Sequence, residues 1–162
     1  MKPEDIKRMD HYFATHSFDV EPHDAVSVDG GLDPDDDDAA GVAYFDNADG
    51  LLLLMRRADD VDHGGLWSFP AGMVEDGETT EQAAVREFAE ETGHALEQVV
   101  RPVKYTGEDG LDFTAFCSFG PKFNPHMDKE HTAFMWTTLH SLPTPLHPGV
   151  KKTLQLLNES KV

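Results

Sequence analysis

Three glutamates share one face of a predicted helix. Glu87, Glu90 and Glu91 stand at positions i, i+3 and i+4, and residues at this spacing are neighbours on an α-helix. Like charges so placed destabilise a solvated helix by roughly 0.2–0.5 kcal/mol per pair. A hard divalent cation removes this repulsion, because Mg²⁺ and Mn²⁺ prefer carboxylate oxygens as ligands. The spacing therefore predicts a metal site, and the alternative is a helix whose acidic face is merely solvated.

The residues before these glutamates predict a loop that is tied to the helix. Gly72 opens a loop after a predicted short strand, Trp67–Pro70, and Gly77 suits a turn before the helix. Arg86 is an i, i+4 partner of the second helical glutamate and can also reach back to Glu78. Such a loop–helix unit would hold carboxylates rigidly, as phosphoryl chemistry requires.

Both ends of the predicted helix have recognisable signals. Thr79 or Thr80 is the predicted N-cap, with Glu81 and Gln82 where a capping-box partner would fall. The helix is predicted to run to about Glu91, after which a glycine suits a left-handed C-terminal cap.

The segment from Gly72 to His94, GMVEDGETTEQAAVREFAEETGH, resembles the signature of the Nudix hydrolase family. As in that signature, five residues separate Gly72 from Glu78, seven separate Glu78 from Arg86, and Glu-apolar-any-Glu-Glu-any-Gly follows. His94 replaces a usually aliphatic residue at a position that packs rather than reacts. The resemblance disfavours the solvated-helix interpretation. It implies a Nudix-type fold and a divalent-metal-dependent hydrolase of diphosphate linkages in nucleotides.

The resemblance also implies roles for individual residues. The implied metal ligands are Glu87, Glu90, Glu91 and the backbone carbonyl of Ala71, which replaces a glycine of the usual FPGG run. The attacking water would lose its proton to Glu87 itself or to Glu130, while Glu78 and Arg86 would orient Glu87. Mg²⁺ or Mn²⁺ is the implied cofactor.

Glu130 is the best-placed candidate for the further acid that often joins the family motif from a loop before a late strand. Glu108 and Asp109 are weaker candidates, and the alternative for Glu130 is a solvated loop acid. The neighbouring His126 and His131 are interpreted as exposed loop histidines.

Substrate contacts are expected from the segment before the motif, RRADDVDHGGLWSFPAG, which looks like that of MutT-type nucleotide pyrophosphohydrolases. Arg56 or Arg57 is predicted to hold a phosphate; the alternative is a salt bridge to a nearby aspartate, Asp59 or Asp60. Phe69, with Trp67, could stack on a base, although an aromatic residue on a strand is commonly a core residue.

The substrate class follows only weakly from the family resemblance. Members that favour ADP-ribose often have a proline about 16 residues past the motif, and diadenosine-polyphosphate members a tyrosine. Here Asp109, Gly110 and Leu111 occupy that region. The prediction is a nucleoside triphosphate, modified or not, cleaved to monophosphate and pyrophosphate. The alternatives are an ADP-ribose or nucleotide-sugar pyrophosphatase and a non-catalytic Nudix-fold nucleotide sensor.

Composition limits the partners and the compartment. With 13 basic and 31 acidic residues the net charge is −18, which argues against nucleic acid and anionic membranes as partners. No apolar segment approaches the roughly 20 residues of a membrane span. Cys117 is the only cysteine, so no intrachain disulfide forms and a cytoplasmic location is expected. The expected partner is a small-molecule nucleotide; the oligomeric state stays open, with a homodimer possible.

The predicted fold is an α/β/α sandwich with a mixed β-sheet and a loop–helix–loop catalytic motif. Residues 1–40 are predicted to hold a helix, Pro3–His16, and an acidic linker, Asp33–Asp38, packed on or leading into a Nudix domain at 41–162. A final helix is predicted from Pro148, with Val150, Leu154 and Leu157 on its inner face. Besides the strand before the motif, the predicted strands are Gly41–Phe45, Leu51–Arg57, Val99–Thr106, Leu111–Phe119 and Ala133–Thr138.

Overall fold

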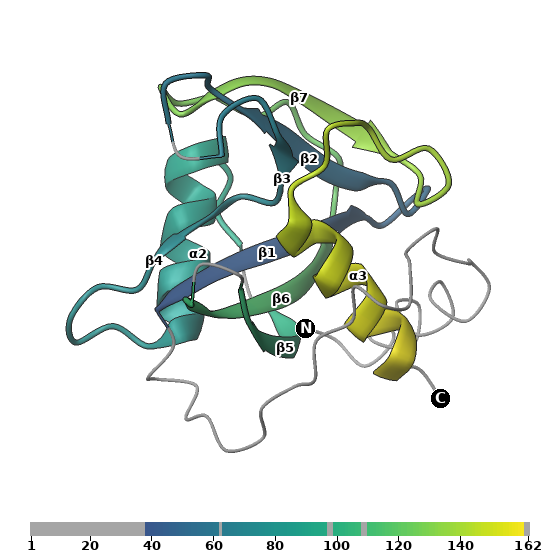
Figure 1. The fold of residues 1–162 in the computed structure, drawn as a ribbon. Helices are drawn as coiled ribbons and strands as arrows, with labels where there is room; N and C mark the ends of the chain where they lie inside the picture. The colour runs from purple at the N-terminus through teal and green to yellow at the C-terminus, as the bar shows by residue number, and fades with distance from the viewer. Residues whose placement is uncertain (1–37, 62, 97–98, 108–109, 161–162) are drawn as a thin grey trace.

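The computed structural model describes residues 38–61, 63–96, 99–107 and 110–160 (Figure 1). The predicted helix Pro3–His16 and most of the acidic linker lie outside the described residues, as do Glu108 and Asp109. The predicted domain division therefore stays a prediction. The first described strand begins at Ala39, slightly before the predicted domain start.

One mixed sheet forms the centre of the molecule (Figure 1). Strands β3, β2, β1, β6 and β5 follow one another across it, while β4 pairs with β1 and β7 pairs with β2. The β1–β6 pair is parallel and the other pairs are antiparallel. The strands are β1 Ala39–Asp46, β2 Leu52–Arg57, β3 Trp67–Ser68, β4 Ala71–Met73, β5 Val100–Thr106, β6 Asp112–Gly120 and β7 His131–Thr137.

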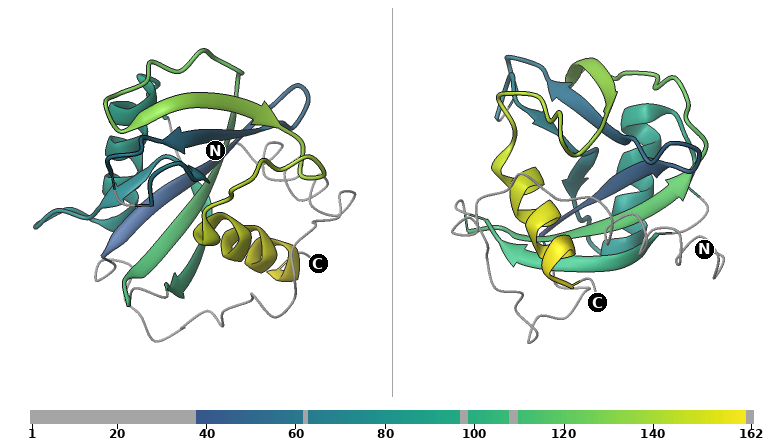
Figure 2. Two further views of the ribbon diagram at one scale, coloured as in Figure 1. Left: turned by 45° about the horizontal axis from the view of Figure 1, so that its top comes forward. Right: turned by 90° about the vertical axis from the view of Figure 1, so that its right-hand side faces the viewer.

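Two helices cover opposite faces of this sheet (Figure 2). Helix α2, Thr80–Thr92, packs Ala83, Ala84 and Phe88 against one face. Helix α3, Pro148–Ser160, packs the three predicted apolar residues of its inner face against the other. The predicted α/β/α sandwich with a mixed sheet is confirmed.

Strand β1 lies at the centre of the sheet. Every one of its residues is buried, and its side chains alternate between the two cores: Val42 and Tyr44 face α2, while Ala43 and Phe45 face the other side. A strand buried on both faces has no polar alternation, which explains its apolar sequence. At its end, the Asp46 carboxylate accepts hydrogen bonds from three backbone N–H groups of the turn into β2.

The segment before α2 differs from the prediction of one strand over 67–70 followed by a loop from Gly72, since β3 ends at Ser68 and β4 contains Gly72. It forms two short strands, because β3 pairs with β2 whereas β4 pairs with β1. Pro70, which has no N–H to donate, separates them, and its carbonyl accepts a hydrogen bond from the Val42 N–H. The change of pairing partner, from β2 to β1, places the β4 backbone beside α2. Among the described residues, no helix has both the length and the apolar character needed to span a membrane.

Candidate functional site

Helix α2 begins and ends where the sequence predicts. The Thr79 hydroxyl accepts a hydrogen bond from the Gln82 N–H at 3.1 Å, and the Gln82 side chain accepts one from the Thr79 N–H at 2.9 Å. Thr79 is thus the N-cap, and the capping-box partner is Gln82 rather than Glu81. Gly93 adopts the left-handed conformation after the last turn, with φ 76°. These caps fix the position of the acidic face.

Arg86 joins the loop to the helix. Its guanidinium donates two hydrogen bonds to Glu78, at 2.7 and 3.0 Å, and one to the Met73 carbonyl at 3.0 Å. It also donates to Glu87 at 2.9 Å and to Glu90 at 3.2 Å. The hydrogen bonds from Arg86 lower the pKa of Glu78, and those to the carboxylates raise the pKa of Arg86. The predicted contacts of Arg86 with Glu78 and Glu90 are therefore present.

Glu87 lies between the helix and the β4 backbone. A Cβ atom added to Gly72 would overlap the Glu87 carboxylate, so only glycine leaves room for this carboxylate. Burial raises the pKa of Glu87, and the charges of Glu90 and Glu130 act in the same direction, against the hydrogen bond from Arg86. A cation would be favoured beside a carboxylate so placed.

Glu91 is a buried acid without a hydrogen-bond partner. Its residue is 1% exposed, and neither carboxylate oxygen has a hydrogen-bond partner among the described residues. Burial, reinforced by the charges of Glu87, Asp128 and Glu130, raises its pKa to about 9. Buried carboxylates are normally paired or coordinate a metal, so the residues present fit a divalent cation.

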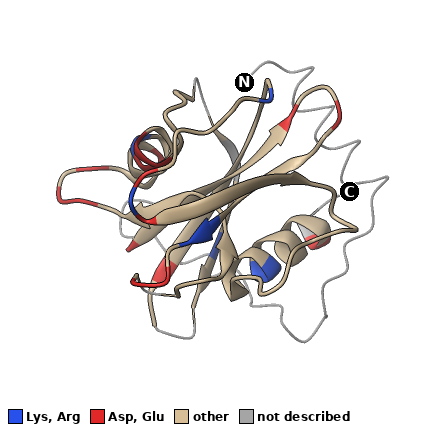
Figure 3. Cartoon of the chain, turned by 90° about the horizontal axis from the view of Figure 1, so that it is seen from above, with Lys and Arg blue, Asp and Glu red and all other residues tan. Residues whose placement is uncertain are grey.

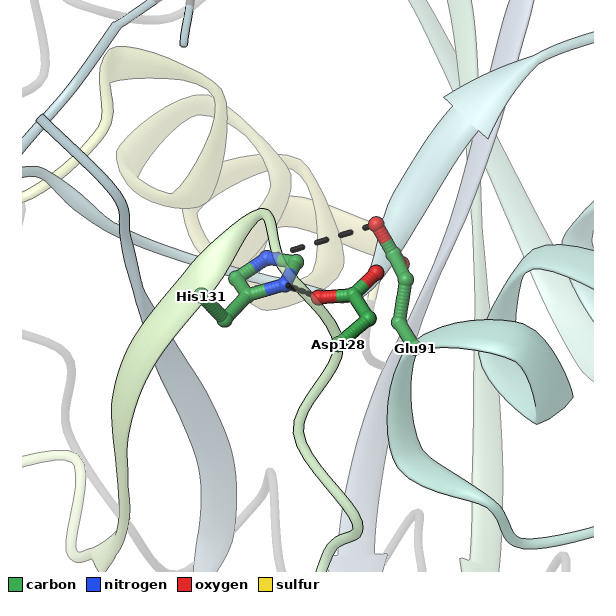
Figure 4. A group of neighbouring side chains, drawn as sticks. All are labelled: Glu91, Asp128 and His131. Carbon is green, nitrogen blue, oxygen red and sulfur yellow. Dashed lines mark hydrogen bonds and ion pairs between the residues drawn. The ribbon is translucent and has the colours of Figure 1, made fainter. Parts of the chain in front are cut away.

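Asp128 and His131 complete this acidic region, and sequence reasoning missed both (Figure 4). His131 Nδ1 lies 2.8 Å from Asp128 Oδ1, and His131 Nε2 lies 4.0 Å from Glu91 Oε1. His131 is buried rather than exposed as predicted, because β7 begins at His131 and not at Ala133. Residues alternate between the faces of a strand, and the first residue of β7 points inward. An Asp-any-any-His spacing was the available signal. His126 is exposed, as predicted.

The other predicted site residues occupy different positions. Glu130 is exposed, lines the cavity described below, and lies close enough to Glu87 and Glu91 to raise both pKa values. The Ala71 backbone lowers the pKa of the Glu91 carboxyl, against the burial and the charges that raise it. Glu90 has a largely exposed side chain that pairs with Arg86. It therefore lies at the edge of the acidic region that Glu87 and Glu91 form.

A cavity of about 510 Å³ adjoins the carboxylates. Ligand pockets commonly have volumes of about 300–1,000 Å³, so a nucleotide fits this size class. Its charged lining residues include Arg57, Glu87, Glu130 and Lys152. The lining also includes aromatic and aliphatic residues, among them Tyr105, Leu111, Phe113 and Val150.

The predicted substrate residues separate into two groups. Arg57 lines the cavity. Arg56 instead donates to Thr132 at 2.9 Å and pairs with Asp59 at 3.3 Å, as the alternative interpretation has it. Phe69 lines the cavity but is a buried core residue, 4% exposed, and Trp67 packs against the same core. The structure thus brings Arg57, but not Arg56, to the cavity.

Acidic residues gather on α2 and on the loop that precedes it (Figure 3). A polyanionic ligand would be repelled there unless cations offset the field. The cavity lining combines acidic residues, among them Glu87 with its raised pKa, with two basic residues, Arg57 and Lys152.

Comparison with known proteins places the same elements in a family context. A family model described as the NUDIX domain matches residues 35–157. "Putative 8-oxo-dGTP diphosphatase 3" of Mycobacterium tuberculosis is 32% identical over 141 residues, covering 73% of this chain and 65% of that protein. "Putative nudix hydrolase 1" of Caenorhabditis elegans is 30% identical over 106 residues, covering 64% of this chain and 29% of that protein. The chain thus spans less than two thirds of the length of either relative.

A solved structure supports the same comparison. The crystal structure of a MutT NUDIX hydrolase from Burkholderia pseudomallei superposes with a TM-score of 0.60 at 29% identity. The match covers 72% of this chain and 94% of that one.

Proposed function

Because the chain belongs to the Nudix hydrolase family, we propose that it hydrolyses a diphosphate linkage in a nucleotide with the help of a divalent cation. The observation that carries this proposal is the buried, unpartnered Glu91 carboxylate close to Glu87, which itself lines a cavity of nucleotide size. The preferred substrate is a nucleoside triphosphate, modified or not, and the products are a nucleoside monophosphate and pyrophosphate.

The cation would be Mg²⁺ or Mn²⁺, held by Glu87, Glu91, Glu130 and the Ala71 carbonyl. When bound, it supplies charge neutralisation for the phosphate oxygens and orientation for a water molecule. Glu90 is a less direct candidate, because its side chain is largely exposed and does not line the cavity.

Individual residues of the chain would have separate roles in the hydrolysis. Water attacks one phosphorus of the diphosphate linkage in line, a P–O bond to the water oxygen forms, and the P–O bond to the bridging oxygen breaks, so that pyrophosphate and the nucleoside monophosphate separate. Glu87 or Glu130 takes the proton of the water. Arg86, itself held by Glu78, keeps the Glu87 carboxylate oriented. A sensor that binds without cleaving would need none of this orientation.

The substrate class is supported by the walls of the cavity. Arg57 and Lys152 could offset phosphate charge, while Tyr105 and Phe113 offer aromatic surface to a base. The name of the mycobacterial relative, a diphosphatase of an oxidised nucleoside triphosphate, agrees with this class.

The experiment measures phosphate and pyrophosphate release from a panel of nucleotides, with Mg²⁺, with Mn²⁺ and with chelator. The panel holds nucleoside triphosphates, oxidised triphosphates, ADP-ribose, nucleotide sugars and dinucleoside polyphosphates. We expect metal-dependent turnover concentrated on triphosphates. Turnover concentrated on ADP-ribose or nucleotide sugars would overturn the substrate class, and binding without turnover would favour a sensor.

Two glutamine variants separate catalysis from folding. Glu87→Gln is expected to lower turnover by about 10²–10⁴-fold, the usual contribution of general acid–base catalysis, while the protein stays folded. Glu81→Gln is the matched control, since Glu81 is an exposed acid on the same helix. Equal turnover by Glu87→Gln and the parent would show that the proposed mechanism is wrong.

A further inference from the structure

Glu91, Asp128 and His131 form a cluster, here called the inner cluster. None of these three residues is among the residues that line the cavity. We infer that the inner cluster binds a divalent transition-metal ion, with His131 Nε2 and a Glu91 oxygen as ligands and Asp128 orienting the imidazole. This inference rests on the proposed function in one respect: Glu91 is also a proposed ligand of the Mg²⁺ or Mn²⁺ ion that Glu87 and Glu130 would hold.

The first support is a set of unpartnered polar atoms. Both Glu91 oxygens and His131 Nε2 are buried and lack a hydrogen-bond partner among the described residues. Leaving a buried polar group unsatisfied is destabilising, and more so for a charged one. Buried polar groups in folded proteins are therefore nearly always paired, and three such atoms facing one another call for an occupant.

The second support is the distance between these atoms. Glu91 Oε1 and His131 Nε2 lie 4.0 Å apart, which is too long for a hydrogen bond. Two metal–ligand bonds of about 2.0–2.2 Å at a tetrahedral angle place the ligand atoms about 3.3–3.6 Å apart, so an approach of about half an ångström would let both atoms bind one ion. Each residue of the inner cluster offers one ligand atom, and these atoms all lie within 4.8 Å of one another.

The third support is the orientation of the histidine. His131 Nδ1 lies 2.8 Å from Asp128 Oδ1, so Nδ1 donates to the carboxylate and the other ring nitrogen faces Glu91 (Figure 4). Metal-binding histidines commonly donate their second N–H to a carboxylate in this way, which fixes both ring and tautomer. In Figure 4 the second Asp128 oxygen points toward Glu91, so Asp128 can also contribute a ligand.

The donor set decides the class of ion. Imidazole nitrogen suits Zn²⁺ and its transition-metal neighbours, whereas Mg²⁺ prefers oxygen ligands and keeps several waters. A buried site with one imidazole and one or two carboxylates therefore favours Zn²⁺ over Mg²⁺. The competing arrangement has no metal: a proton shared between Glu91 and His131 would join the two side chains directly.

The experiment follows the histidine rings directly. The full chain, labelled with ¹⁵N-histidine and freed of metal, is titrated with Zn²⁺ and separately with Mg²⁺, and the ring nitrogen resonances are recorded by NMR. His131→Gln identifies the His131 signals among the nine histidines of the chain. We expect Zn²⁺, but not Mg²⁺, to shift Nε2 of His131 to the position of a metal-bound nitrogen.

Affinity measurements on variants give a second readout. His131→Gln is expected to weaken Zn²⁺ binding at least about tenfold, and Asp128→Asn about 10–100-fold, as for outer partners of metal-binding histidines. His140→Gln, a change at an exposed histidine, should leave the affinity unchanged. If His131→Gln does not fold, Asp128→Asn takes its place: the ring signals that this change perturbs identify His131, which contacts Asp128, and its Zn²⁺ affinity is compared with that of the parent.

Two results would overturn the inference: His131 resonances that Zn²⁺ leaves in place, or equal Zn²⁺ affinity in the parent and in His131→Gln. Either result would favour the shared proton. The outcome is independent of the proposed function, because Mg²⁺-dependent turnover without Zn²⁺ at His131 would remove only this inference. Zn²⁺ at His131 without turnover on any nucleotide would remove only the proposed function.

Discussion

Among single residues, Arg86 has the widest set of contacts in the candidate site. Its guanidinium contacts Glu78, Glu87, Glu90 and the Met73 carbonyl. A planar fork of donors can satisfy several acceptors in fixed directions at once, which a lysine ammonium cannot. The orientation of Glu87 therefore depends on the shape of the arginine side chain as well as on its charge.

Replacing Arg86 with lysine should lower kcat by roughly 10–100-fold, the usual cost of losing an outer partner of a metal-binding group. The KM should change little, because Arg86 does not line the cavity. Steady-state kinetics on the preferred nucleotide would measure both constants. Lys151→Arg, at an exposed position on α3, is the control. An unchanged kcat would show that Glu87 keeps its orientation without the guanidinium.

Among the elements, the contact between β4 and α2 sets the geometry of the site. Gly72 belongs to β4, which pairs with β1, and its backbone lies directly against Glu87 of α2. Glycine is the residue that permits such a close approach of backbone to a functional group. The space between β4 and α2 at Gly72 is therefore just large enough for the Glu87 carboxylate.

Gly72→Ala should abolish most turnover while the protein stays folded, because the new methyl group would occupy the position of the Glu87 carboxylate. Activity assays together with thermal unfolding would separate the two effects. Glu81→Ala, at an exposed position of α2 outside the cavity lining, should keep normal activity. Full activity in Gly72→Ala would mean that Glu87 functions from a different position.

The sequence predicted the parts of the site that are local in the chain. The caps of α2, the Arg86 contacts and the acidic face all follow from spacing within one loop and one helix. The inner cluster could not be predicted in this way, because Asp128 and His131 reach Glu91 only through the pairing of β7 with β2. Strand β4, which replaces the start of the predicted loop, likewise depends on a distant partner, because it pairs with β1 whereas β3 pairs with β2.

For the whole molecule, the buried acids link stability to pH and to metal. The pKa of Glu91 is raised from an ordinary 4.5 to about 9 in the folded protein. Between these values the folded chain keeps a proton that the unfolded chain releases. Rising pH therefore favours unfolding of the metal-free protein. A bound cation would replace that proton and remove the dependence.

In chelator, the free energy of unfolding should fall as pH rises between about 4.5 and about 9, by up to about 1.4 kcal/mol per pH unit. Urea unfolding at several pH values within this window would measure the slope. Glu91→Gln should flatten it, because the amide does not titrate, and Glu81→Gln should not. A slope that persists in Glu91→Gln would assign the effect to other groups.

The segment that carries Asp128 is attached to the end of α2 by several contacts. The His94 ring stacks on Phe123 with centroids 4.1 Å apart, and the His126 N–H donates to the Thr92 carbonyl at 2.7 Å. His94, the one departure from the family signature, is thus the partner of this segment. In a chimaera with a relative, helix α2 and the segment 121–130 would have to be exchanged together. A graft of either part alone would lose the stacking between His94, which lies just after α2, and Phe123 of the segment.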